Sequence, residues 1–255
     1  MDLNQLKDFL PLVTGFLGGA TSSGVFAGPI KTLQDWWYIN YGHDLSSQAA
    51  LLRAKNEIDV ENLKNSTLQQ VATIPPENIQ EPSLKILGPA LEASRYYIEE
   101  EELRSMFAKI LSGSLDNRKN KILHPSFVEI VKQLDVTDAN ILKHLKTKDY
   151  HESYPIPTMR MIIKKEQGYN VILPIIYFIT GTEGLDKFSA SLTNLERLGL
   201  VNLHTDIWNS NDNDYEVIRN NQDVKNILAL YPECALEKTS FTITPLGKNF
   251  LKICL

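Results

Sequence analysis

The sequence of 255 residues predicts a mainly helical fold of the α+β class. Two observations support this prediction. Apolar residues recur every three or four positions through most of the first 150 residues, a spacing typical of amphipathic helices. Runs of β-branched and alternating residues begin only after Tyr154, which indicates strands near the C-terminus. We therefore expect a helical N-terminal arm at 1–80, a helical middle domain at 81–150, and an α+β part with a small β hairpin at 151–255.

The composition is that of an ordinary globular protein. Hydrophobic residues make up 43% and charged residues 22%, and the formal net charge of -5 argues against non-specific attraction to nucleic acid or anionic lipid. Cys234 and Cys254 stand in no metal-binding spacing, which excludes a zinc site built from cysteines within one chain. The first residues lack the basic region of a signal peptide. The expected location is therefore the cytoplasm, with membrane association through residues 9–30 as the alternative.

Residues 9–30 carry no charge, and as a helix they would span roughly 33 Å, close to the hydrocarbon thickness of a bilayer. Hydroxyl residues make insertion into lipid less favourable. Four small residues recur at every fourth position and so share one helix stripe, where two backbones can approach closely: Gly15, Gly19, Ser23 and Ala27. Three interpretations stay open here, namely a buried or oligomer-forming helix, a membrane-inserting helix, and a loop-rich entry segment.

A long amphipathic helix is expected next, over residues 31–65, because apolar residues keep the three-to-four spacing there. Residues 66–81 are expected to be a linker. The adjacent Pro75 and Pro76 cannot continue a helix, since proline lacks the backbone donor and restricts the residue before it.

The strongest helix prediction covers residues 95–115, after a shorter helix over 82–93. Residues 99–102 are all glutamates, which the helix dipole favours near the first turn. Successive helical residues point in different directions, so these four cannot converge on one metal ion. Glu100 is expected to pair with Arg104, four residues further along.

Two more helices are expected in the middle domain, over residues 126–134 and 137–146. His124 precedes a proline at the entry to the first of them and is interpreted as a capping residue. Asp135 or Thr137 is the expected cap of the second.

Beyond Tyr154 the β-branched runs at 159–165 and 171–179 predict a hairpin or two short strands, the second weakened by Pro174. A helix over 185–198 follows, closed by Gly199 in the position that favours a left-handed backbone.

Two further strands are expected at 200–203 and 241–244, with a last helix at 246–254. The insertion between them, 205–238, holds seven acidic and three basic residues, and its stretch 209–214 has the composition of a flexible loop. The order helix, strand, polar excursion, strand resembles a degenerate winged helix.

A winged helix usually binds DNA, with the helix before the wing in the major groove. Here that helix offers Lys187, Asn194 and Arg197 as candidate contacts, and acidic neighbours offset its two cations. Duplex phosphates would also repel the acidic insertion. We therefore interpret these three residues as a docking helix for protein, with DNA as the alternative ligand.

No enzyme signature emerges from the sequence. It contains no GxSxG, HExxH, GxGxxG or GxxxxGK[ST] motif, and its five histidines show no ligand spacing. We therefore expect a non-enzymatic protein, with no catalytic, metal-binding or cofactor-binding residues and no cofactor.

Several helix faces together resemble the Abi-alpha family, a bacterial family linked to abortive phage infection and otherwise regarded as a domain of unknown function. The segments that carry the resemblance are 87–93, 101–111, 124–134 and 194–200. The resemblance covers roughly residues 80 to 203 and the tail from 241 to 254. It implies no catalytic residues.

The resemblance and the small-residue stripe together suggest an anti-phage factor that acts through protein contacts or self-assembly, as a homo-oligomer. Two alternatives belong to other classes. One is a transcriptional regulator that reads DNA with residues 185–198, and the other is a membrane effector whose residues 9–30 insert into a bilayer.

Overall fold

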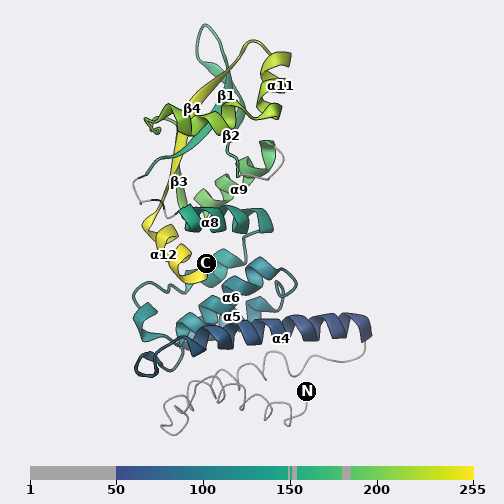
Figure 1. The fold of residues 1–255 in the computed structure, drawn as a ribbon, viewed down its shortest axis with the longest axis vertical. Helices are drawn as coiled ribbons and strands as arrows, with labels where there is room; N and C mark the ends of the chain where they lie inside the picture. Colours follow the sequence, from purple (N-terminus) through teal and green to yellow (C-terminus); the bar gives the residue numbers. More distant parts are fainter. Residues whose placement is uncertain (1–49, 149, 151–153, 180–184) are drawn as a thin grey trace. The chain divides into compact units, whose positions relative to one another are not determined.

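The computed structural model describes residues 50–148, 150, 154–179 and 185–255, and the side chains of this part except those of 50–56 and 185–187. This part of the chain divides into two compact units (Figure 1). Among the described residues, the first comprises 50–133 together with Lys252–Leu255, and the second comprises Leu134–Leu251. The class is α+β, as predicted. The sequence placed a division after residue 150, whereas the units divide before the helix that follows Gln133.

The first unit is helical. Its central helix, α6, contacts three others, α4, α5 and α7. The bounds are α4 Ala50–Ala72, α5 Leu84–Ser94, α6 Glu101–Ser114 and α7 Ser126–Val131, with short 3-10 turns at Pro76–Asn78 and Asn117–Lys119. The buried stripe of α6 is fully shielded from solvent: Leu103, Met106, Phe107, Ile110 and Leu111. The predicted helix over 95–115 is thus confirmed in its core, and its amphipathic spacing explains which face α6 buries.

Helix α4 continues to Ala72, past the end expected at residue 65. Residues 66–72 contain neither proline nor glycine, and two of them face the interior, since Thr67 and Val71 are buried. Packing against α6 therefore extends the helix until the prolines at 75 and 76 end it.

The expected pair between Glu100 and Arg104 is wrong. The Arg104 guanidinium instead donates to Asp59 of α4 at 2.8 Å and to the carbonyl of Ile98 at 2.6 Å. Both charged side chains of the Arg104–Asp59 pair are largely buried, so the pair fixes α4 against α6 in a place where water screens it little.

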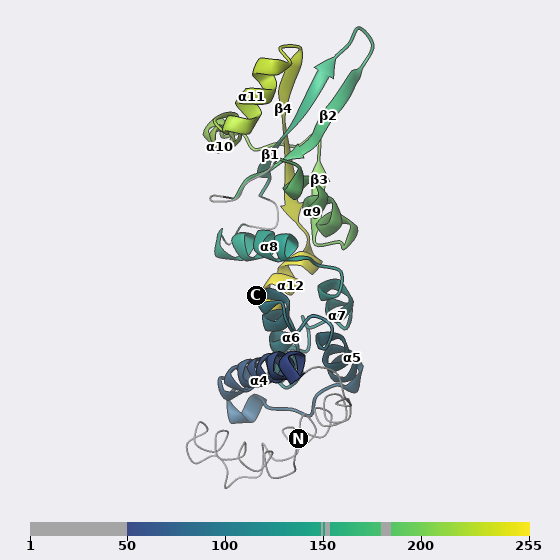
Figure 2. The same ribbon diagram turned by 90° about the vertical axis from the view of Figure 1, so that its right-hand side faces the viewer.

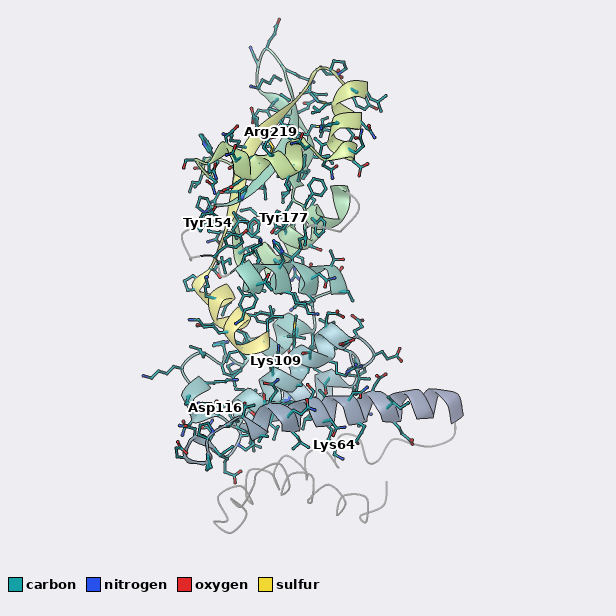
Figure 3. The ribbon with its side chains drawn as sticks, in the orientation of Figure 1. Lys64, Lys109, Asp116, Tyr154, Tyr177 and Arg219 are labelled. Carbon is teal, nitrogen blue, oxygen red and sulfur yellow. The ribbon has the colours of Figure 1, made fainter. Side chains whose placement is uncertain are left out.

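The loop after α6, which carries Asp116 (Figure 3), is held by hydrogen bonds to the linker that precedes α5. Gln80 and Asn120 exchange two side-chain hydrogen bonds, of 2.7 and 2.8 Å. Asp116 is buried and accepts from the Arg118 side chain at 2.8 and 2.7 Å. The hydrogen bond from Arg118 lowers the pKa of the Asp116 carboxyl below its usual value. His124 accepts from the backbone N–H of Ser126 at 3.1 Å, which confirms its capping role.

The second unit contains a four-stranded antiparallel sheet with the strand order β2-β1-β4-β3 (Figure 2). The strands are β1 Ile156–Lys164, β2 Tyr169–Ile176, β3 Val201–His204 and β4 Cys234–Ile243. The predicted hairpin and the predicted pair of later strands are therefore parts of one sheet. Pro174 lies in the edge strand β2, where a missing backbone donor costs least.

The described part of the second unit also holds helices: α8 Val136–Lys148, α9 Leu185–Arg197, α10 Glu216–Arg219, α11 Gln222–Leu230 and α12 Pro245–Cys254, the last of which ends in the first unit. Helix α9 ends as predicted. Gly199 has a φ of 74°, and the N–H of Leu200 donates to the carbonyl of Leu195 at 2.9 Å. The winged-helix interpretation of α9, β3 and β4 stays a prediction.

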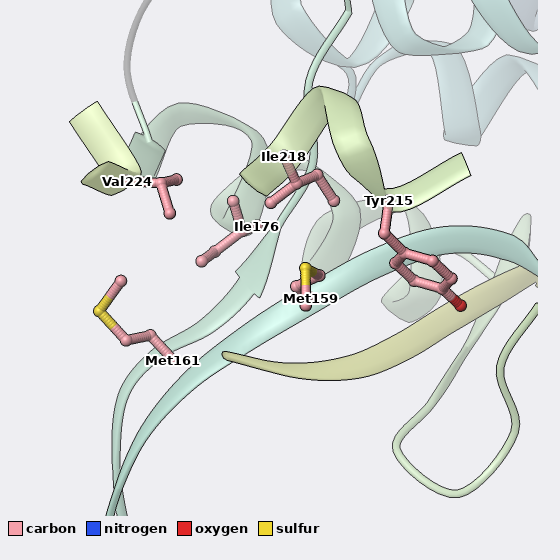
Figure 4. Close-up of a cluster of buried hydrophobic side chains, with 6 residues drawn as sticks. All are labelled: Met159, Met161, Ile176, Tyr215, Ile218 and Val224. Carbon is pink, nitrogen blue, oxygen red and sulfur yellow. The ribbon is translucent and has the colours of Figure 1, made fainter. Parts of the chain in front are cut away.

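The insertion at 205–238 is more ordered than its composition indicated. Strand β4 begins inside it at Cys234, not at residue 241, and a 3-10 turn, Asp212–Tyr215, leads into α10 and α11. Its apolar side chains join a buried cluster with those of the sheet (Figure 4): Met159, Met161, Ile176, Tyr215, Ile218 and Val224. The insertion folds because these apolar residues are spaced along a polar segment and cover one face of β1 and β2.

Candidate functional site

The residues expected to form the assembly or membrane stripe, Gly15, Gly19, Ser23 and Ala27, lie outside the described residues, so their role stays a prediction. The Lys187 side chain is likewise not described. From residue 50 onward, gaps excepted, the structure holds no helix with the length and hydropathy to cross a bilayer. Within the same part, no group of three acidic, histidine or cysteine side chains could hold a metal ion.

The other two residues of the expected docking helix lie at the contact between α9 and α8. The side-chain amide of Asn194 donates to Asp138 Oδ2 at 2.8 Å. The guanidinium of Arg197 donates to Asn194 Oδ1, with Nη2 at 2.7 Å. A single chain of hydrogen bonds therefore runs from Arg197 through Asn194 to Asp138. Asn194 and Asp138 thus join two helices inside the second unit, and Arg197 bonds Asn194 from the same helix.

Asp138 also closes the N-terminus of α8. Its backbone N–H donates to Asp135 Oδ1 at 2.7 Å, and its own Oδ2 accepts from the backbone N–H of Asp135 at 3.1 Å. This reciprocal arrangement is a capping box, and it shows that Asp135 is the cap, one of the two residues that the sequence proposed. The Asp138 side chain therefore accepts one hydrogen bond from the N-terminus of its own helix and another from the neighbouring helix α9.

The Asp138 carboxyl is placed where a charge is unfavourable. The residue is only 2% exposed, and its Oδ1 has no hydrogen-bond partner among the described residues. Burial raises the pKa of Asp138, and the hydrogen bonds from Asp135 and Asn194 oppose that shift without cancelling it. A buried carboxylate oxygen without a donor bears the full cost of losing its water.

A second polar cluster lies at the start of the insertion. The side-chain amide of Asn209 donates to Tyr154 Oη at 2.7 Å and to Asp214 Oδ2 at 3.0 Å, and the Tyr154 hydroxyl donates to the same Asp214 oxygen at 3.1 Å. The backbone N–H of Asn209 donates to Tyr215 Oη at 2.8 Å. The segment 209–214, predicted to be a flexible loop, is instead held at Asn209 and Asp214 by buried and partly buried hydrogen bonds.

Ion pairs extend this cluster toward the solvent (Figure 3). Asp212 accepts from Arg219 at 2.8 and 3.0 Å and also pairs with Lys238 of β4. The hydrogen bonds from Arg219 and then Lys238 lower the pKa of Asp212 far below its usual value. Both cations also lie over the ring of Tyr215, Lys238 at 5.2 Å and Arg219 at 5.9 Å from its centre. The charges of the insertion thus pair with one another across the folded segment.

The surface that the sequence did not single out is the outer edge of β2. Strand order makes β2 an edge strand, and its residues 169–172 are all exposed. Because successive strand residues point to opposite faces, this run is open on both faces of the hairpin. None of these residues is charged, and Tyr169, Val171 and Ile172 are between 43% and 49% exposed. We call residues 169–172 the β2 edge.

Further exposed apolar side chains lie at the same end of the sheet. Leu230 is 74% and Tyr231 52% exposed at the end of α11. Cys234 lies three residues after Tyr231 and pairs with Ile163, next to the end of β1. The β1–β2 connection projects clear of the helices in both ribbon views (Figures 1 and 2). One further contact stabilises the hairpin: the Arg160 guanidinium stacks on Tyr169 at 4.7 Å from the ring centre.

Fold and site together define a class: an α+β protein with a helical unit and a sheet unit, in which the side chains of each described polar cluster hydrogen-bond one another and the hairpin presents an uncharged strand edge. The chain belongs to the Abi_alpha family, described as abortive infection alpha, whose family model matches residues 55–254. No curated protein matches the chain. A solved structure of an uncharacterized protein from the hydrocarbon-degrading marine bacterium Alcanivorax borkumensis SK2 is 18% identical, over 54% of this chain and 94% of that chain, with a TM-score of 0.33.

Proposed function

We propose that this protein is a bacterial anti-phage factor of the abortive-infection type, which acts without catalysis by associating with further copies of itself. The family description supplies the biological setting. The observation that carries the mode of action is the β2 edge, an exposed and uncharged strand edge at the free end of a hairpin.

An open strand edge presents unpaired N–H and C=O groups, and folded proteins commonly protect such edges with charges, prolines or bulges. In this sheet the protection covers only part of β2. Pro174 lies in its second half, and the pairing with β1 is irregular between Met159 and Ile162. The shift between Met161 and Ile162 leaves Ile172 without a partner on β1, so the irregularity reaches the β2 edge. The β2 edge itself carries neither a charge nor a proline.

A second copy is the occupant that suits this edge. Antiparallel pairing of β2 with β2 of another copy is a two-fold contact, in which the same residues meet on both sides. Since residues 169–172 carry no charge, the like strands would meet without repulsion, and β-branched Val171 and Ile172 favour extended pairing. Exposed Leu230 and Tyr231 at the same end of the sheet would add apolar area to the contact.

The geometry at α9 also supports protein contacts over DNA reading. Of the residues expected to face a DNA groove, Asn194 hydrogen-bonds Asp138 on α8, and Arg197 hydrogen-bonds Asn194. The Asn194 amide is thus engaged in the contact between α9 and α8, so it is less available to read base edges.

The test changes Val171→Lys together with Ile172→Lys. Both residues are exposed, so the chain should fold, while two charges on the β2 edge should weaken association at least about tenfold, equivalent to about 1.4 kcal/mol. Light scattering should find the wild-type protein above its chain mass of 28.9 kDa and the variant at that mass. In cells that express the variant, phage should plate as efficiently as on cells without the protein.

Val217→Lys is the matched control, because Val217 is 60% exposed on α10, away from the β2 edge. This variant should assemble and protect like the wild type. A wild-type protein that stays at 28.9 kDa at every concentration, or a double-lysine variant that still assembles and protects, would contradict the proposal. Protection by a monomeric wild type would point to a different protein as partner.

A further inference from the structure

We propose that the contact between α8 and α9 is a pH-responsive latch, closed while the Asp138 carboxyl is neutral and loosened when that carboxyl ionises. The proposal is independent of the self-association argued above. It rests on how one buried side chain is shared between two helices of the second unit.

The two carboxyl oxygens of Asp138 have different surroundings. Oδ2 accepts from the backbone N–H of Asp135 and from the side-chain amide of Asn194, so it completes the cap of α8 and the bridge to α9. Oδ1 is buried and meets no donor among the described residues. A proton on Oδ1 would remove the buried charge and leave both hydrogen bonds to Oδ2 in place. Burial therefore favours the neutral form at this position more than in the unfolded chain.

Among the described side chains, those that face Asp138 do not supply a compensating charge of their own. Asp135, on the same helix end, is itself acidic, and its charge works against ionisation of Asp138. From α9 come the neutral groups of Asn194 and Ser191, and the Arg197 guanidinium donates to Asn194 Oδ1. The ionised carboxylate is thus held by neutral donors in a place that water does not reach.

The direction of the pH effect follows from this arrangement. Burial raises the pKa of Asp138 in the folded protein above that in the unfolded chain. The stability that this group contributes is fully present below the unfolded pKa, near 3.8, and is lost as pH rises through the folded pKa. Other carboxyls, such as Asp116 and Asp212, have lowered pKa values and change stability in the opposite direction. The effect of Asp138 must therefore be measured as the difference in unfolding free energy between the wild type and a variant at this position.

Asp138→Asn provides that difference, because asparagine has nearly the same shape, keeps one oxygen acceptor and does not titrate. Urea unfolding of the full chain should be measured for both proteins at a series of pH values from 4 to 8. With rising pH the wild type should lose stability relative to Asp138→Asn, by about tenfold in the unfolding equilibrium for each unit by which the folded pKa exceeds the unfolded one. Amide exchange in α8 and α9 should speed up in parallel, compared with Asp138→Asn at the same pH.

A purely structural role for Asp138 would shift stability by the same amount at every pH, and that result would overturn the proposal. A second measurement does not depend on the variant folding. NMR titration of the Asp138 carboxyl carbon in the wild-type protein should give a midpoint above 3.8. A midpoint at or below that value would also overturn the latch.

Discussion

Gly247→Ala should destabilise the protein by about 3 kcal/mol, although glycine to alanine usually stabilises a helix. Gly247 lies in the first turn of α12, and a Cβ atom added there would lie 2.1 Å from the carbonyl oxygen of Leu200 and 3.0 Å from Ile243 Cγ2. The neighbouring atom is backbone and not the end of a flexible side chain, so α12 and the start of β3 must separate.

The separation would also break hydrogen bonds that hold the same corner. The Thr244 hydroxyl donates to the carbonyl of Gly199 at 2.6 Å and accepts from the N–H of Gly247 at 2.9 Å, and the N–H of Thr244 donates to the carbonyl of Leu200 at 3.0 Å. This corner joins the end of α9, the entry to β3 and the start of α12. The melting temperature should fall by about 6–12 °C.

Gly113→Ala is the matched control within a helix. A Cβ at Gly113 in α6 would meet Lys119 Cδ at 3.5 Å and Leu123 Cδ2 at 3.7 Å, which are ordinary contacts. This variant should gain up to about 0.5–1 kcal/mol, because alanine loses less backbone entropy than glycine on folding. Thermal and urea unfolding of both variants checks the pair. Similar effects of the same sign would show that Gly247 is not a point of close packing.

Tyr215→Ala should cost about 3–5 kcal/mol, the usual range for removing a fully buried aromatic side chain. Tyr215 is 0% exposed and fills the cluster between the sheet and α10, alongside Met159 and Ile218. The truncation would leave a cavity and would detach the insertion from the sheet. Urea unfolding should show the loss, and limited proteolysis should cut the segment 205–233 sooner than in the wild type.

Tyr215→Phe separates packing from hydrogen bonding at the same position. The phenylalanine ring keeps the apolar contacts, while the buried N–H of Asn209 loses the acceptor that lies 2.8 Å away. The expected cost is about 1–3 kcal/mol, the price of one buried unsatisfied donor. If Tyr215→Ala unfolds at the urea concentration of the wild type, the insertion does not depend on this cluster for its order.

The helical half of the fold could be predicted because its signals are local. The stripe Leu103, Met106, Phe107, Ile110 and Leu111 is buried as its spacing indicated, and Gly199 ends α9 with the expected positive φ. The partner of Arg104 could not be predicted, because Asp59 lies 45 residues away and reaches it only through the packing of α4 on α6. The i,i+4 spacing rule considers only residues on the same helix, and it therefore identified Glu100.

In the candidate site too, the sequence could identify only the features that depend on local patterns. Lys187, Asn194 and Arg197 were chosen as candidate contacts on one helix, and the structure shows that Asn194 donates to Asp138 on α8 while Arg197 donates to Asn194 on the same helix. Asp138 itself could have been found from the sequence, since Asp135 and Asp138 have the spacing of a capping box. The β2 edge could not, because a strand is an edge only when its neighbours are known.

The sequence by itself determined the α+β class, the central helix of the first unit, the hairpin, the cap at His124 and the glycine that ends α9, and its helix faces carried the family resemblance. These features depend on backbone preferences and periodicity within a few turns of chain. Only the tertiary structure decided the strand order, the order within the insertion and the burial of Asp138. Each of these depends on contacts between residues far apart in sequence, whose burial and pairing energies no local pattern encodes.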